Sequence, residues 1–568
     1  MSVDEIKPGM HGIAKTVVSG SKIEEFGIEV LGILKDKSPT GDLILIRVYG
    51  DLIEKTGIAQ GMSGSPVYID GRLIGAISYG WALTDHKTGM VTPIADMLKI
   101  WTLPGSEPNR PAVTPSDDGQ DEAQPLATPI MAAGFSHNAL QMLKEKLAPF
   151  RLVPYGVGSQ TGDTEVQPLQ PGSIVGVELV RGDVSLGALG TVTYTEDDKV
   201  LAFGHPFLKK GKANMFLTNA QVITVINGLE NAFKVGITGE AVGMVNQDRS
   251  AGIGGVVGRY PDIIPMRIIA RDNSTGNSRD AAVQVIQDEQ LSPLLAATTV
   301  FNVIDKTLDR TGPGTAHVYF EIAGQQMPVD TIARENMFYS AANIGEQSVA
   351  ELFEIITALL HNQYNSVDIM DVKVHVILDS ERKTAAVMEA RANKKEVRPG
   401  DSVDIAVKLK PFRGEKTITR TVTFKVPKNQ PDGPLTLEVR GGGFVPLIYA
   451  LLGNQGMDNE GKKPKKQRTF ADLVESFTSR DRNNDIVAEV LDMNYDDLNG
   501  NGPAPQPRKG KPKAVSQEEQ LPKFVKPGGK TPGVKDSANK TKFHVTTDYI
   551  IEGDTQVMLQ VVSDAKGR

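Results

Sequence analysis

The sequence contains no cysteine, so disulfide bonds, thiolate metal sites and a cysteine nucleophile are excluded. Long apolar runs are missing too: Phe444 to Leu452 falls well short of the roughly 20 residues of a membrane helix and contains Pro446. A net charge of -7 over 568 residues is too mild to indicate a nucleic-acid surface. The start, MSVDEIKPGM, shows no signal peptide, because no basic segment precedes an apolar run. We therefore expect a globular chain of several domains in a compartment that composition leaves open.

A glycine-rich corner in the stretch GMSGSPVYIDGRLIGAISYG, from Gly61 to Gly80, is the first candidate site. A serine hydroxyl becomes a nucleophile only with a base and with donors for the oxyanion that follows its attack. Glycines beside Ser63 allow backbone conformations in which the N–H groups of Gly61 and Ser63 point to one place, as in an oxyanion hole. Behind the corner, Asp70-Gly71 predicts a two-residue hairpin turn.

A base for this serine must come from elsewhere in the chain, which has only eight histidines. Seven of them stand in strand, helix or loop patterns without glycine framing. His205 differs because it lies in Gly204-His205-Pro206, at the end of the apolar strand from Val200 to Phe203. A strand end facing a cleft would hold a general base rigidly, so we take His205 as the candidate. On spacing alone, a lone histidine after a strand is more often structural than catalytic.

Composition shifts divide the chain into segments. Strand patterns dominate the first hundred residues and return from Gly172 to Arg271, separated by a polar linker. Lysine, proline and glycine dominate a long later tract whose lysines we interpret as solvation. In chain order we expect a β lobe with the serine motif at 1–104, a flexible linker at 105–127, a β lobe with the histidine motif at 128–300, an α/β connecting segment at 301–368, a β-sandwich at 369–455 plus 542–568, and a mostly disordered insertion at 456–541.

The clearest helix lies between Ser348 and Tyr364, where apolar residues recur with a period of 3.6. Ser348 and Glu351 match a capping box at its start. After this helix, alternating segments at 372–378, 403–409 and 417–426 favour a small β-sandwich. Shorter helices are expected at 138–147, 471–477 and 486–491.

Two motifs together resemble a known family. GMSGSPVYIDGRLIGAISYG, preceded by LIEKTGIAQ, resembles the serine motif of the SpoIVB-type sporulation serine peptidases, and GTVTY…LAFGHPF resembles their histidine motif. The resemblance covers roughly residues 6 to 100 and 170 to 270. It implies a mainly β chain with a trypsin-like, two-lobed β-barrel unit. It also implies Ser63 as nucleophile, His205 as general base and the amides of Gly61 and Ser63 as oxyanion hole, with Ser65 as the rival serine.

The sequence departs from the family pattern in three respects. The serine segment precedes the histidine segment here, so we expect a permuted unit, which a triad defined in space can tolerate. No clear PDZ-like module precedes the histidine motif. The family aspartate has no direct counterpart: Asp51 is the closest carboxylate, Asp248 is a rival, and a Ser/His dyad without a carboxylate is a third alternative.

The first functional hypothesis is a serine endopeptidase that cleaves a protein or peptide, whose extended chain pairs with an exposed strand edge of either lobe. Self-processing at 105–124 or 456–541 is a variant of it. The alternative is a catalytically silent, peptidase-like scaffold or binding protein of the bacterial envelope. We expect no metal or other cofactor, because no metal or phosphate motif is present. The resemblance favours an exported location.

Overall fold

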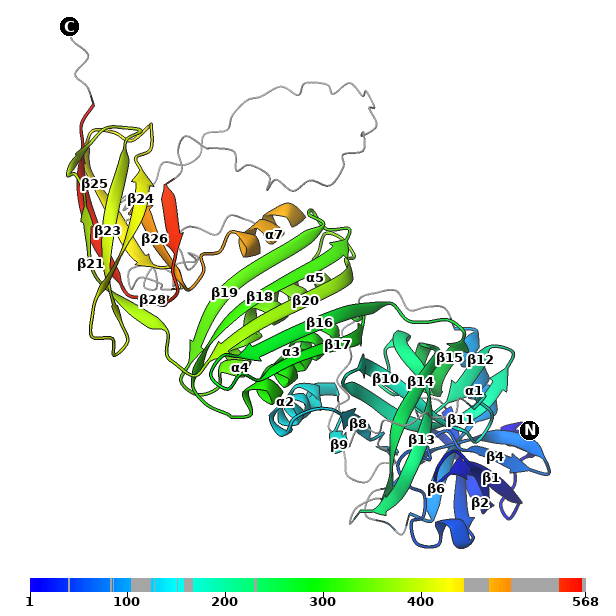
Figure 1. The fold of residues 1–568 in the computed structure, drawn as a ribbon. Helices are drawn as coiled ribbons and strands as arrows, with labels where there is room; N and C mark the ends of the chain where they lie inside the picture. Colours follow the sequence, from blue (N-terminus) through cyan, green and yellow to red (C-terminus); the bar gives the residue numbers. More distant parts are fainter. Residues whose placement is uncertain are drawn as a thin grey trace, which may run out of the picture. The chain divides into compact units, whose positions relative to one another are not determined.

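The computed structural model describes residues 1–38, 41–81, 84, 86–103, 124–126, 128–150, 152–157, 167–228, 232–443, 469–491 and 541–563. Over these residues the protein is mainly β, as the sequence predicts, and the chain divides into two compact units (Figure 1). One unit comprises 1–381 with 467–479, and the other comprises 382–466 with 480–568. The expected linker at 105–127 and insertion at 456–541 lie largely outside the described residues.

The first unit begins, after a short 3-10 turn η1 (Val3–Glu5), with a closed barrel. Its strands are β1 (His11–Val17), β2 (Ile23–Ser38), β3 (Gly41–Tyr49), β4 (Pro66–Ile69), β5 (Arg72–Gly80) and β6 (Thr88–Pro93). Because β4 pairs with both β1 and β5, the order β1-β2-β3-β6-β5-β4 returns to β1. Apolar side chains such as Ile28, Ile46 and Val67 fill the interior.

The predicted hairpin turn of this barrel is confirmed. Asp70 and Gly71 join β4 to β5 with φ angles of 50° and 73°. Two consecutive positive φ values define the turn whose twist matches that of the flanking strands, and Asp-Gly is a preferred pair for it. The local sequence therefore fixes the geometry directly behind the serine corner.

A second barrel follows the same plan. Its strands are β10 (Ile174–Gly182), β11 (Ser185–Glu196), β12 (Lys199–Ala202), β13 (Gly211–Asn227), β14 (Ala232–Arg249) and β15 (Gly252–Val257). The order β10-β13-β14-β15-β12-β11 closes because β10 also pairs with β11. The described residues thus contain two closed six-stranded barrels, which agrees with the expected two-lobed β-barrel unit.

The long β13–β14 hairpin fastens the two barrels together. Val222 of β13 exchanges backbone hydrogen bonds with Gly20, and Phe233 of β14 forms a bridge with Gln60. Ala232 is buried in the core of the first barrel. A second contact comes from α1 (Ile94–Leu98) and η3 (Lys99–Trp101), whose apolar side chains pack with residues of the second barrel. The site motifs on the two barrels are therefore held in one unit.

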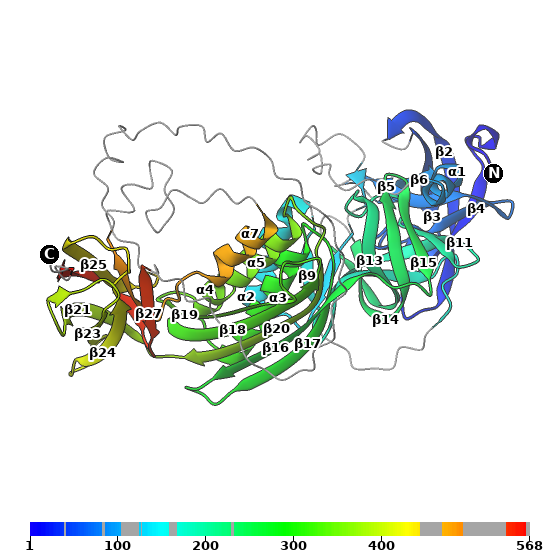
Figure 2. The same cartoon turned by 90° about the horizontal axis from the view of Figure 1, so that it is seen from above.

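Beyond the second barrel, the sheet continues on both sides. The strands β16 (Ile263–Asp272), β17 (Ser278–Ile286), β18 (Gly314–Gln325), β19 (Thr331–Ser340) and β20 (Asp368–Asp379) extend it from β10, and β8 (Ile130–Ala133) and β9 (Pro154–Val157) extend it from β11. The curved extension packs against helices on one face (Figure 2). These helices are α2 (His137–Leu147), α3 (Ser292–Leu308), α4 (Ile344–Ser348), α5 (Ala350–Leu360) and α7 (Phe470–Thr478), with the 3-10 turn η4 (Ala148–Phe150) after α2.

Strand β20 lies in this sheet and not in the β-sandwich that the sequence analysis begins at 369. It pairs in parallel with β16 and antiparallel with β18 over most of its length. Its alternating pattern, with Val372, Val374 and Val376 buried, is the same in a sandwich or in a sheet covered by helices on one face. Periodicity therefore identified the strand but not its partners.

The helix predictions are correct for three segments and wrong in two details. Helices α2, α5 and α7 occupy the expected regions. The capping box is absent: Asn343 caps α4 one turn earlier, and Ser348 donates to the carbonyl of Ile344. Glu351 instead binds Arg334 and Asn336 of β19. The expected helix at 486–491 is a strand, because two neighbouring strands pair with it.

The second unit consists of two sheets around one apolar core. One sheet contains β21 (Thr384–Ala392), β23 (Ser402–Pro411), β24 (Ile418–Lys425) and β28 (Ile550–Glu552). The other contains β22 (Glu396–Val397), β25 (Gly433–Gly441), β26 (Asp485–Val490), β27 (Lys542–Thr546) and β29 (Asp554–Val561). This arrangement is a β-sandwich. It contains none of the candidate site residues.

Candidate active site

The serine corner, residues 61–65, lies in the first barrel directly before β4 and contacts the second barrel. Gly61 and Gly64 have φ angles of 88° and 93°, which glycine adopts without steric cost. The carbonyl oxygen of Ser63 accepts a hydrogen bond from the amide of Thr191 in β11, 2.8 Å away. Ser63 is fully buried, and its Oγ has no hydrogen-bond partner in the described structure.

Two amides of the corner have no hydrogen-bond acceptor among the described residues. In the described part of the chain, the N–H groups of Gly61 and Ser63 have no acceptor, whereas those of Met62, Gly64 and Ser65 all donate to backbone carbonyls. Unpaired donors on alternate residues are what an oxyanion hole presents before substrate binds. The amides of Gly61 and Ser63 are therefore the two of the corner without a described partner, and their role as an oxyanion hole stays a prediction.

Gly64 makes the closest contact between the barrels at this point. A Cβ atom at Gly64 would lie 1.9 Å from the carbonyl oxygen of Thr191 and 2.5 Å from the amide nitrogen of Phe203. The carbonyl of Gly64 also accepts from the hydroxyl of Thr193, at 2.8 Å. The serine corner thus lies directly against β11 and against Phe203, two residues before His205.

His205 is placed by a strained turn at the end of β12. Phe203 and Gly204 have φ angles of 70° and 69°, and such a conformation is costly for phenylalanine. The ring lies between the aromatic rings of Phe203 and Tyr79, with centroid distances of 5.9 and 6.5 Å. A strained backbone persists only where the surrounding packing holds it in place. Strained residues of this kind cluster at functional sites.

The hydrogen bonds of His205 define its tautomer. Its Nδ1 lies 2.8 Å from the carbonyl oxygen of Pro206, which can only accept, so Nδ1 carries the proton. Nε2 is then an unprotonated acceptor, and it has no partner in the described structure. Burial lowers the pKa of His205 to about 4, so the ring is neutral at neutral pH.

Strand β5 lies under both motifs and brings them together. The amide of Gly64 donates to the carbonyl of Ile77, and a Cβ atom at Gly204 would lie 3.1 Å from the Cβ of Ser78. Thr92 of β6 binds the carbonyl of Gly204 at 2.7 Å. The serine and histidine motifs, 142 residues apart by their numbers 63 and 205, therefore converge on one strand.

No hydrogen bond joins Ser63 to His205 in the described structure. Instead, Ser63 Oγ, Ser65 Oγ and His205 Nε2 are all buried without partners. Such orphaned groups are uncommon in folded proteins and require an explanation. The amide of Ser65 donates to the carbonyl of Met62, so Ser65, unlike Ser63, has no unpaired amide to offer an oxyanion.

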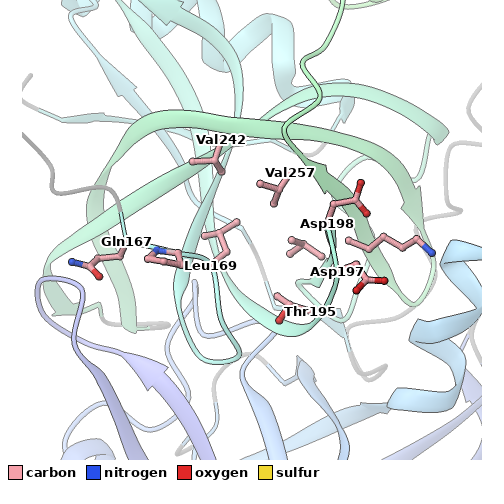
Figure 3. Close-up of a pocket in the computed structure, with 10 residues that line it drawn as sticks. Gln167, Leu169, Thr195, Asp197, Asp198, Val242 and Val257 are labelled. Atoms are coloured by element: carbon pink, nitrogen blue, oxygen red, sulfur yellow. The ribbon is translucent and has the colours of Figure 1, made fainter.

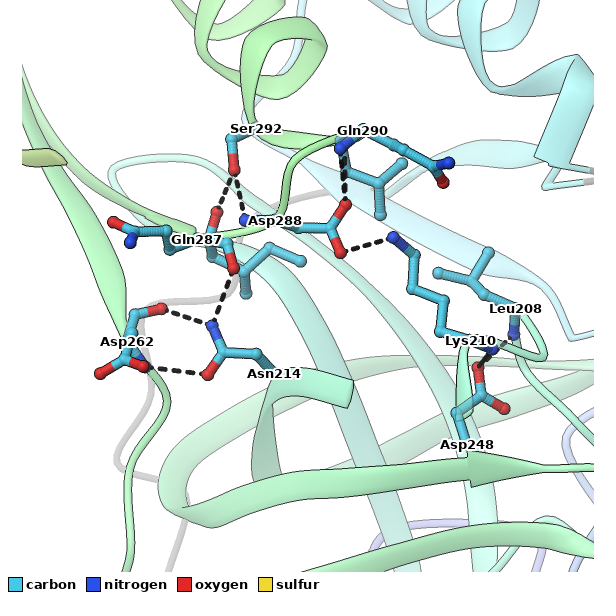
Figure 4. Close-up of polar contacts among 11 residues, drawn as sticks. Leu208, Lys210, Asn214, Asp248, Asp262, Gln287, Asp288, Gln290 and Ser292 are labelled. Carbon is cyan, nitrogen blue, oxygen red and sulfur yellow. Dashed lines mark hydrogen bonds and ion pairs between the residues drawn. The ribbon is translucent and has the colours of Figure 1, made fainter. Parts of the chain in front are cut away.

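Asp248 lies beside the histidine motif but does not contact the imidazole in the described structure. Its carboxylate accepts from the amides of Phe207 and Leu208 at 2.8 and 2.7 Å, and from that of Lys210 at 3.4 Å. Figure 4 shows Lys210 extending onward to Asp288, four residues before the start of α3. Burial raises the pKa of Asp248, and the backbone donors oppose this rise. Asp248 thus fixes the loop that follows His205.

Asp51, the other candidate acid, lies elsewhere. It begins the 3-10 turn η2 (Asp51–Ile53) after β3 and is exposed to solvent. No hydrogen bond or ion pair is described between its carboxylate and the rest of the described chain. The structure therefore does not bring Asp51 to His205.

Lys234 was not singled out by sequence reasoning, yet it is fully buried beneath the serine corner. Its Nζ donates to Thr16 Oγ1 at 2.9 Å, and its stem would contact a Cβ at Gly61 at 3.2 Å. Burial lowers the pKa of Lys234 to about 7. The sequence pattern that could have identified it is the alternation of β14, in which Lys234 stands at an inward-facing position between Ala232 and Gly236.

Replacing Asp248 by asparagine should loosen the histidine loop. An amide group would face backbone donors with its own N–H₂, so we expect a loss of about 2–4 kcal/mol in unfolding free energy. Thermal and denaturant unfolding measure this. The exposed Asp262→Asn variant is the control and should change stability little. Equal stability of both variants would show that the carboxylate does not hold the loop.

A separate cavity of about 580 Å³ opens beside the β11–β12 turn (Figure 3). Its walls combine apolar side chains with two carboxylates and a lysine. The lining residues are Gln167, Pro168, Leu169, Thr195, Asp197, Asp198, Lys199, Val200, Val242 and Val257. None of them is a candidate catalytic or oxyanion-hole residue, so we do not include this cavity in the candidate site.

One six-stranded barrel carries a serine on a glycine corner and the other carries a histidine, which are the residue types that a β-barrel serine peptidase uses. Residues 2–98 match the family described as SpoIVB peptidase S55, which supports a SpoIVB-type serine peptidase at the family level. The matched region includes Ser63 but not His205. No curated protein and no solved structure matches the chain significantly.

Two features are absent from the described residues. No helix there is long and apolar enough to cross a membrane. No group of three histidine, aspartate or glutamate side chains there is placed to hold a metal ion.

Proposed function

We propose that the protein is a serine endopeptidase in which Ser63 is the nucleophile and His205 the general base. The observation that carries the proposal is the pair of buried, unpartnered atoms Ser63 Oγ and His205 Nε2, on motifs that converge on β5. Unsatisfied polar groups cost free energy, and a bound substrate that draws the two side chains together would recover it.

In this mechanism, Nε2 of His205 accepts the hydroxyl proton of Ser63 as Oγ attacks the peptide carbonyl. The Nδ1–H bond to the carbonyl of Pro206 keeps the ring in the required tautomer, a role that a carboxylate performs in triads. The amides of Gly61 and Ser63 bind the oxyanion. His205 then protonates the leaving amine, and water hydrolyses the acyl-enzyme by the same steps in reverse.

The proposal includes no catalytic carboxylate. Asp51 is exposed and unpaired with His205, and Asp248 is occupied by the loop amides, so a dyad describes the site best. We further propose action outside the cytoplasm, because SpoIVB-family peptidases are secreted or membrane-associated. Fractionation of the producing cells tests this location.

A fluorophosphonate probe tests the nucleophile and its base directly. We expect mass spectrometry to find the label on Ser63, no labelling of Ser63→Ala, and a labelling rate at least about 100-fold lower for His205→Ala, as general base catalysis supplies that factor. Ser65→Ala is the matched control and should retain labelling. Labelling at Ser65, or labelling that is independent of His205, would contradict the assignment.

The second candidate function is a catalytically silent, peptidase-like scaffold. The full burial of Ser63 and His205 favours it, because a substrate cannot reach either group in this conformation. A folded protein that stays unlabelled under all conditions, including in the variants described below, would support the scaffold.

The proposed self-cleavage at 105–124 or 456–541 concerns segments largely outside the described residues.

A further inference from the structure

Strand β5 continues past the point where β4 stops pairing with it. Strand β4 covers β5 only from Arg72 to Ala76, and after that the serine corner takes its place, with Ile77 bonded to Gly64 and Ser65. The pairing of β5 with β6 shifts register between Ile77 and Tyr79. A bulge of this kind re-aims the backbone groups that follow it. Residues 78–80 of β5 therefore present an edge beside the corner that no strand of the barrel covers.

A segment of the chain from outside the barrel occupies this edge. Strand β7 (Gln124–Pro125) pairs antiparallel with β5, placing Pro125 opposite Tyr79 and Gln124 opposite Gly80. The next residue, Leu126, donates its amide to the carbonyl of Ser78 at 2.9 Å. Extended peptides bind to exposed sheet edges in this way, with backbone hydrogen bonds supplying affinity.

The side chain of Leu126 lies in an apolar site. It is partly buried and packs against the core of the first barrel. A Cβ atom at Gly80 would lie only 3.2 Å from its Cδ2, so glycine at this position leaves the space that Leu126 fills. The edge thus offers backbone groups for any peptide together with one recess for an apolar side chain.

Among the residues of the added strand, Leu126 is connected to the serine corner by the shortest path of hydrogen bonds. Its partner Ser78 follows Ile77, whose carbonyl accepts from Gly64, the residue after Ser63. The strand therefore runs from Gly80 toward the serine corner. Tyr79, which it covers, lies against the ring of His205.

We propose that residues 124–126 block the β5 edge at residues 78–80 in the resting protein, that they must leave before a substrate peptide can pair there, and that the edge selects an apolar side chain where Leu126 lies. The inference rests on the proposed function and names its substrate class. An occupant on the same chain is present at a high effective concentration, so it competes strongly with free substrate.

The occupant is tested with Leu126→Asp, which places a charge in the apolar recess. We expect the rate of fluorophosphonate labelling at Ser63 to rise by at least about tenfold, because the intramolecular competitor is weakened. Leu103→Asp is the matched control: it is an exposed leucine at the other described end of the linker, and its labelling rate should equal that of the unmodified protein. Equal rates in both variants, with Ser63 labelled, would overturn the inference and leave the proposed function standing.

A binding measurement keeps the inference testable if Ser63 proves unreactive. In the Ser63→Ala, Leu126→Asp protein, calorimetry should detect binding of acetyl-Gln-Pro-Leu-amide and little or none of acetyl-Gln-Pro-Asp-amide. Adding Gly80→Val, which fills the recess, should abolish binding of the leucine peptide. Equal affinity for the two peptides, or binding of neither to a folded protein, would overturn the assignment of this edge regardless of the chemistry at Ser63.

Discussion

Gly64→Ala should lower the unfolding free energy by more than about 4 kcal/mol, the range reached only by severe backbone or core defects. Two independent costs add. The φ angle of 93° is strained for alanine, and the new methyl group would collide at 1.9 Å with the carbonyl oxygen of Thr191. The atoms that the methyl group meets are backbone atoms of the second barrel, so no side-chain rotation can relieve the clash. Relief requires the barrels to separate at the serine corner.

A matched control separates strain from collision. Gly9 has a similar φ of 83°, but a Cβ there would meet nothing within 4 Å. Gly9→Ala should therefore cost only about 1 kcal/mol. Denaturant unfolding of both variants measures the difference. If the two variants have similar stability, the barrels are not in the close contact described at Gly64.

The residues of the site were predictable where one local pattern determines the geometry. Asp70-Gly71 can form a tight turn without tertiary support, and the glycines around Ser63 permit a backbone that other residues avoid. His205 was separable from the other histidines by its glycine-framed strand end. These features depend on neighbours in sequence, which is why sequence reasoning identified them.

Features that depend on distant partners were not predictable in the same way. Whether β20 joins a sheet or a sandwich is decided by β16 and β18, whose pairing leaves no mark on its alternation. Segment 486–491 is a strand because β25 and β27 flank it. The edge at 78–80 and its occupant at 124–126 lie more than 40 positions apart in sequence. Only the folded chain brings such groups together.

Lys234→Met should stabilise the protein at pH 6 by about 3–5 kcal/mol, since burial lowers the pKa of Lys234 from 10.5 to about 7 and each pKa unit corresponds to about 1.4 kcal/mol. The unfolded chain binds the proton more tightly than the folded chain does. The penalty is therefore complete below pH 7 and disappears as the pH rises toward 10.5. Methionine keeps the apolar stem that packs on Gly61 and removes only the amine.

Denaturant unfolding from pH 6 to pH 9.5 measures the effect of this substitution. Above pH 7 the gain should shrink by about 1.4 kcal/mol per pH unit. Lys22→Met, at a lysine whose side chain is 79% exposed, should show no such trend, because water solvates its ammonium in both states. A gain for Lys234→Met that does not vary with pH would mean that the amine is charged at every pH tested, and thus that the protein supplies a counter-charge or water beneath the serine corner.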